Sequence, residues 1–153
     1  MGGEFSCRWI SKRAALTTDY LKGDPTCMTD FQYLEDVDAI LGIVEGELSY
    51  QKYKDSVADL MKFPPYKPGM SVIWDLRRTT SKSLSSQDVQ SVASYSKTLD
   101  NTRGNWKAAL VIPSLLEYGL GRMFQAWLED APFALHVCYT IEEAKAWLKA
   151  KDT

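Results

Sequence analysis

The sequence predicts an α/β fold: one five-stranded mixed sheet with about four helices packed on it. The clearest observation is that residues 107–148 have the pattern strand, helix, strand, helix, in which residues 108–112 form an unbroken apolar run. Such runs without polar alternation are typical of strands covered on both faces. The same pattern of an apolar run followed by helical spacing begins at residue 71. Because strand, helix, strand units connect by right-handed crossovers, we expect all of them in one sheet.

The five strands are expected near residues 30–35, 39–45, 71–76, 107–112 and 134–139. The first two are separated only by a short polar turn, Asp36 to Asp38, and are therefore expected to form a hairpin. A hairpin pairs its strands antiparallel, whereas crossovers through helices give parallel strands. The first strand should therefore be antiparallel to the second, and the last four should be mutually parallel.

Helix starts are indicated by hydroxyl side chains that can accept a hydrogen bond from a first-turn backbone N–H. Ser49 precedes one apolar stripe at helical spacing, and Ser85 or Ser86 precedes the next. Two further helix starts have the spacing of a capping box, Ser114 with Glu117 and Thr140 with Glu143. We therefore expect helices after Ser49, Ser85, Ser114 and Thr140.

The length of 153 residues suits a single domain. We expect an N-terminal extension over residues 1–27, whose first residues resemble a cloning remnant, and an α/β domain over residues 28–150. No segment approaches the roughly 20 apolar residues of a membrane span, and no signal-peptide core is visible. The sequence therefore predicts a cytoplasmic protein without a membrane span.

Charge and composition exclude several function classes. The formal net charge of −2 gives no broad basic field, so nucleic acid is not an expected partner. Three cysteines without metal-ligand spacing and a single histidine favour reduced thiols and no metal site. No cofactor motif is present either, because Gly119-Leu120-Gly121 lacks the third glycine of a dinucleotide fingerprint.

Several groups of residues in the last third of the chain resemble the SpoIIAA-like proteins, also called STAS/SEC14-domain proteins. They are Ile-Pro-Ser at 112–114, Tyr-Gly-Leu-Gly-Arg-Met-Phe at 118–124, the strand region 132–139, and Glu-Ala-Lys-Ala-Trp-Leu at 143–148. The order of strands and helices over residues 28–149 also resembles the STAS domain of anti-sigma-factor antagonists. The resemblance implies the fold and a binding or regulatory module of the STAS type. It implies no particular activity, because that group is mostly of unassigned activity and a shared fold does not transmit function.

The resemblance also implies candidate phosphorylation sites. The antagonists carry an Asp-Ser-Ser-Gly type motif at the start of the helix after the third core strand, and its serine is a phosphorylation switch. In this chain the corresponding position holds Ser83, Ser85 and Ser86, with hydroxyls but no glycine. These three serines are the phosphorylation candidates.

A first candidate binding site lies where the strands end. Ligands of open α/β sheets tend to bind at the carboxyl edge, where helices begin. Asp75 lies at the end of one strand, Arg77 and Arg78 begin a segment 77–86 expected to be a loop, and Ser85 and Ser114 lie at helix starts. Two guanidiniums beside helix N-termini favour an anion or an acidic partner. The alternative is that the arginines are solvated and the serines only cap helices.

A second candidate site lies at the start of the helix after Ser114. Gly119 and Gly121 each cost helix stability of about 1 kcal/mol relative to alanine, which indicates a close backbone approach or a kink. Tyr118 and Arg122 beside them are candidate contacts to a ligand or a protein partner. A salt bridge across the helix surface is the alternative for Arg122.

No catalytic residues are assigned, since His136 lies in a strand without a nucleophile or carboxylate that can be placed beside it. The leading hypothesis is a non-catalytic binding or regulatory module for a protein partner or a small anionic or amphipathic ligand. The alternatives are a SEC14-type carrier of apolar ligands and a small enzyme. An aromatic content of 12% also favours a homodimer.

Overall fold

The computed structural model describes residues 29–82, 84–99, 107–128 and 134–150. The expected extension at residues 1–27 and Ser83 lie outside this part of the chain. Five strands form one sheet in the order of their numbering: β1 (Thr29–Leu34), β2 (Ala39–Glu47), β3 (Ser71–Thr80), β4 (Lys107–Val111) and β5 (Ala134–Cys138). The helices of the described ranges are α2 (Tyr50–Lys62), α3 (Ser86–Thr98), α5 (Leu115–Trp127) and α6 (Ile141–Lys149).

The strand directions confirm the predicted mixed sheet. β1 pairs antiparallel with β2, and β2, β3, β4 and β5 pair in parallel along the sheet. The β1–β2 turn includes Asp38, which has a positive φ of 51°. Aspartate tolerates this left-handed backbone better than most residues, so the turn can be short.

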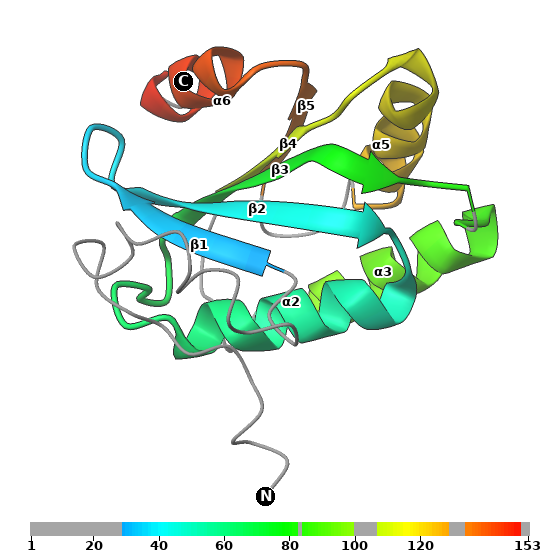
Figure 1. Ribbon diagram of the computed structural model, residues 1–153, viewed down its shortest axis with the longest axis horizontal. Helices are drawn as coiled ribbons and strands as arrows, with labels where there is room; N and C mark the ends of the chain where they lie inside the picture. Colours follow the sequence, from blue (N-terminus) through cyan, green and yellow to red (C-terminus); the bar gives the residue numbers. More distant parts are fainter. Residues whose placement is uncertain (1–28, 83, 100–106, 129–133, 151–153) are drawn as a thin grey trace, which may run out of the picture.

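The helices cover both faces of the sheet. In Figure 1, α6 lies on the opposite side of the sheet from α2 and α3. Alternation along β4 shows the same division, because Ala108 packs in the cluster with Phe124 of α5, whereas Ala109 packs in the cluster with Ala144 of α6. We call the two sides the α6 face and the three-helix face, the latter covered by α2, α3 and α5.

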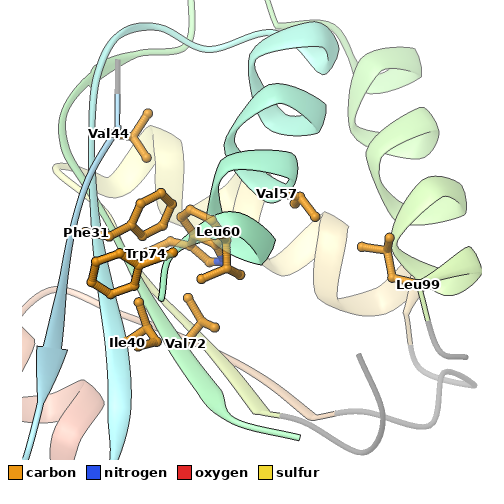
Figure 2. Close-up of a cluster of buried hydrophobic side chains, with 9 residues drawn as sticks. Phe31, Ile40, Val44, Val57, Leu60, Val72, Trp74 and Leu99 are labelled. Atoms are coloured by element: carbon orange, nitrogen blue, oxygen red, sulfur yellow. The ribbon is translucent and has the colours of Figure 1, made fainter. Parts of the chain in front are cut away.

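The largest core cluster lies on the three-helix face. Figure 2 shows Phe31, Ile40 and Trp74 of the sheet against Leu60 of α2. The Phe31 and Trp74 rings meet edge to face with centroids 5.8 Å apart. A Cβ at Gly42 would approach Phe31 to 2.9 Å and Trp74 to 3.0 Å, so the two rings occupy the space that a side chain on β2 would need.

β3 is longer than the sequence indicates. Arg77, Arg78, Thr79 and Thr80 were expected in a loop, but they continue the strand beside β2, and Leu48 N donates to Thr80 O at 2.8 Å. The register passes from Ile43 opposite Asp75 to Glu45 opposite Arg78, so β3 carries one extra residue in a bulge. These polar residues belong to a strand because β2 extends far enough to pair with them.

Candidate functional site

An apolar cavity of about 120 Å³ lies between the sheet and the three-helix layer. Its walls are mainly aliphatic and aromatic side chains from strands and helices, among them Val44, Trp74, Leu110, Val89, Val92 and Phe124. The cavity extends along the carboxyl half of the strands, because its lining residues lie from the middle of β2, β3 and β4 to the first turns of the helices. This is the part of an open α/β sheet in which ligands usually bind.

Polar side chains line one end of the cavity, which we call the polar rim. Ser49 and Lys52 come from the start of α2, Thr79 and Ser81 from the end of β3 and just beyond, and Glu117 from the first turn of α5. All five lie at the carboxyl edge, where these helices begin. The cavity therefore has an almost wholly apolar surface, with a group of polar residues at the carboxyl edge.

Glu117 joins two segments of the rim. Its carboxylate accepts a hydrogen bond from Ser81 Oγ at 2.7 Å and another from Ser114 Oγ. These bonds, first that of Ser114 and then that of Ser81, lower the pKa of Glu117, so it is ionised at neutral pH. Sequence reasoning treated Glu117 only as a capping partner, and no local signal links it to Ser81, 36 residues away.

The capping box expected at Ser114 is wrong. Ser114 is the N-cap of α5, but its side chain accepts no hydrogen bond from the first-turn backbone. Its hydroxyl donates to Glu117 instead, because the carboxylate is turned toward Ser81 and not back to the N-cap N–H. The caps expected at Ser49, Ser85 and Thr140 are confirmed.

Lys52 is the cationic residue of the rim. Its backbone N–H donates to the capping Ser49 Oγ at 3.0 Å, and its Nζ donates to Glu45 O at 2.7 Å. The side chain therefore reaches from α2 to the end of β2 beside the cavity. Sequence reasoning did not select Lys52, because a half-buried lysine on a helix has no pattern that separates it from its exposed neighbours.

The structure places Asp75, Arg77 and Arg78 outside the cavity lining. Asp75 follows Ile73 by two residues and so lies on the α6 face, where its carboxylate accepts from Arg77 Nε at 2.8 Å and Nη2 at 2.9 Å. Arg78 pairs with Glu45 at 3.0 Å. Burial alone would raise the pKa of Asp75, but the bonds and charge of Arg77 outweigh it and hold that pKa below its usual value.

Two of the candidate phosphorylation sites, Ser85 and Ser86, are at the start of α3. Ser85 is its N-cap and forms a capping box with Asp88, in which Asp88 N donates to Ser85 Oγ at 3.1 Å. Ser86 is the first residue of the helix and is exposed. The Ser85 hydroxyl is therefore engaged in holding the helix start.

Tyr118, which is half-buried, and Arg122, which is exposed, form a cluster on α5 outside the cavity lining. Tyr118 stacks on Tyr139, with ring centroids 5.3 Å apart, and Arg122 Nη1 lies 3.5 Å from the Tyr118 hydroxyl. Leu115, at the start of the same helix, is 78% exposed. We call Leu115, Tyr118, Arg122 and Tyr139 the α5 surface.

The two glycines of α5 have different environments. A Cβ at Gly121 would lie 2.9 Å from Val137 Cγ1, whereas one at Gly119 would meet nothing within 4 Å. The predicted close approach is thus confirmed at Gly121, where α5 packs directly on β5. This contact places Leu120 and Phe124 along the cavity wall.

His136 and Cys138 lie on the α6 face. His136 stacks on Trp147 with ring centroids 5.0 Å apart, and burial lowers its pKa. Burial also raises the pKa of the Cys138 thiol to about 11, so it is protonated at neutral pH. Within the described ranges no three His, Cys, Asp or Glu side chains group closely enough to hold a metal ion, and no helix is long and apolar enough to cross a membrane.

The strand order and the two helical layers define the class of fold: the chain has a SpoIIAA-like α/β fold. It is similar to the crystal structure of an uncharacterised protein of the DUF3478 family from Shewanella loihica, which is described as having a SpoIIAA-like fold. The two structures align with a TM-score of 0.52 and 14% sequence identity, over 78% of this chain and 91% of the other. No family model and no curated protein matches the sequence. The likeness concerns the fold, since the neighbour has no described activity.

Proposed function

We propose that the protein is a binding module for a small amphipathic ligand, which occupies the cavity between the sheet and the three-helix layer. The observation that carries the proposal is the cavity itself, apolar inside and polar at the rim. Sites for small molecules are usually concave and apolar, with a few polar groups that fix the orientation of the ligand. The rim residues Ser49, Lys52 and Ser81 supply such groups.

The volume of the cavity sets the size of the ligand's apolar part. An engineered protein cavity of about 150 Å³ accommodates benzene. A cavity of about 120 Å³ therefore suits a group of about the size of a benzene ring or a short branched chain. This favours a small ligand over the lipid-length chain that a SEC14-type carrier would hold.

Filling the cavity should abolish binding of a probe of this size. In the wild-type protein, benzyl alcohol should shift the methyl NMR signals of Val89 and Leu110 in a saturable way. Val92→Phe places a ring in the cavity and should remove these shifts, whereas Ser94→Phe adds the same ring at an exposed position of α3 and should retain them. Leu110→Ala enlarges the cavity and should retain binding. The proposal fails if benzyl alcohol leaves the wild-type methyl signals unchanged up to its solubility limit.

A second candidate role is self-association through the α5 surface. It is supported by Leu115, which exposes 78% of its area next to the stacked Tyr118 and Tyr139. Exposed aromatic and aliphatic side chains gathered with an arginine are typical of interfaces. The expected result is a two-chain mass in sedimentation equilibrium that falls to one chain in Leu115→Glu. A one-chain mass for the wild type at high concentration would dismiss this role.

A further inference from the structure

The two charged residues of the polar rim differ in their hydrogen bonds. Among the described residues that line the cavity, Lys52 is the one cation and Glu117 the one anion. Each carboxylate oxygen of Glu117 already accepts a serine hydroxyl, from Ser81 and from Ser114. A cationic ligand at Glu117 would have to compete with both hydrogen bonds.

Lys52 is better placed to bind a ligand group. An ammonium carries three N–H donors, and the Glu45 carbonyl accepts one of them at 2.7 Å. The hydroxyl of Ser49, which accepts from the Lys52 backbone N–H, has its own proton to donate. An anionic acceptor can therefore join the rim without breaking an interaction of the described side chains.

We infer that the ligand is a small monocarboxylic acid, whose apolar group fills the cavity and whose carboxylate accepts hydrogen bonds from the Lys52 ammonium. This inference rests on the proposed function and specifies its ligand class. A carboxylate adds one negative charge to a rim that already contains Glu117, and Lys52 balances it. A phosphate monoester would add nearly two negative charges and would be repelled more strongly by Glu117.

The magnitude of the Lys52 contribution follows from charge-assisted hydrogen bonding. Hydrogen bonds to charged groups contribute more binding free energy than neutral ones. The difference corresponds to a preference of about 10-fold or more for the anion over a neutral ligand of the same shape. Benzoate, benzyl alcohol and benzylamine carry the same ring with a negative, a neutral and a positive end. They therefore separate the effect of charge from that of the apolar cavity.

The test compares the dissociation constants of these three probes, measured by NMR titration, for the wild type and two lysine variants. In the wild type, benzoate should bind about 10-fold more tightly than benzyl alcohol, and benzylamine should bind most weakly. Lys52→Met should lose the preference for benzoate and retain benzyl alcohol binding, which also shows that its cavity is folded. The control Lys54→Met removes the next lysine of α2, which packs over Tyr50 away from the cavity lining, and should keep the preference.

The charge-conserving variant Lys52→Arg should bind benzoate more tightly than benzyl alcohol, as the wild type does, because it keeps the positive charge that Lys52→Met removes. If benzyl alcohol binds but benzoate binds no more tightly, or if the preference persists in Lys52→Met, the carboxylate inference is wrong and the proposed function stands. If no probe binds to the wild type, the proposed function and the inference fail together.

Discussion

At the scale of single residues, the structure gives Arg77 and Arg78 different environments. Both were candidates for an anion site, and both form ion pairs within the sheet. Arg77 pairs with Asp75, whose side chain is only 6% exposed, whereas Arg78 pairs with Glu45, whose side chain is 56% exposed. A buried carboxylate that loses its partner is costly, but an exposed pair contributes little because water and salt screen it.

Replacing each arginine with methionine should therefore give different losses of stability. Arg77→Met leaves the buried Asp75 without its guanidinium and should lower the free energy of unfolding at pH 7 by about 1–3 kcal/mol. The matched variant Arg78→Met should cost less than about 1 kcal/mol. Urea denaturation measures both values. Equal losses would contradict the structural role of Arg77.

The pH dependence of this difference has a defined sign. The pKa of Asp75 is lowered in the folded protein, so its pairing with Arg77 stabilises the fold above the unfolded pKa of about 3.9 and is lost as the pH falls through the folded value. Without Arg77, burial raises the pKa of Asp75. The stability gap between wild type and Arg77→Met should therefore narrow as the pH falls from the raised pKa of Asp75 in the variant to its lowered pKa in the wild type. A gap that is constant from pH 7 to acid conditions would show that the charge pair does not cause it.

At the scale of elements, the sequence predicts most of the fold, because strands and helix starts have local signals. The apolar run before Pro113 is β4, and Thr140 with Glu143 forms the capping box of α6. The end of β3 was not predictable in this way. Arg77 and Arg78 are polar, and only pairing with the extended β2 keeps them in the sheet.

The candidate site was less predictable than the fold, since it depends on contacts between distant segments. The Ser81–Glu117 hydrogen bond joins the end of β3 to the start of α5, and nothing local in either segment indicates it. The cavity depends on how closely each helix approaches the sheet. Gly121 could be recognised as a site of close approach, but its contact with Val137 required the structure.

At the scale of the whole molecule, the two faces of the sheet differ. On the α6 face, Leu41, Ile73 and Val111 are buried beneath α6, and Lys145 of α6 pairs with Asp36 of the β1–β2 turn at 3.0 Å. On the three-helix face, close packing around Phe31 and Trp74 gives way to the cavity toward the carboxyl edge. The described α6 face thus contains a buried cluster, whereas the three-helix face contains the cavity.

The most direct test of this account is a crystal structure of the protein with benzyl alcohol bound. The account predicts electron density for the ring inside the cavity, between Val44, Leu110 and Phe124, with the hydroxyl toward the polar rim. Density for the ring on the α6 face beside Arg77 and Arg78, with the cavity empty, would contradict it.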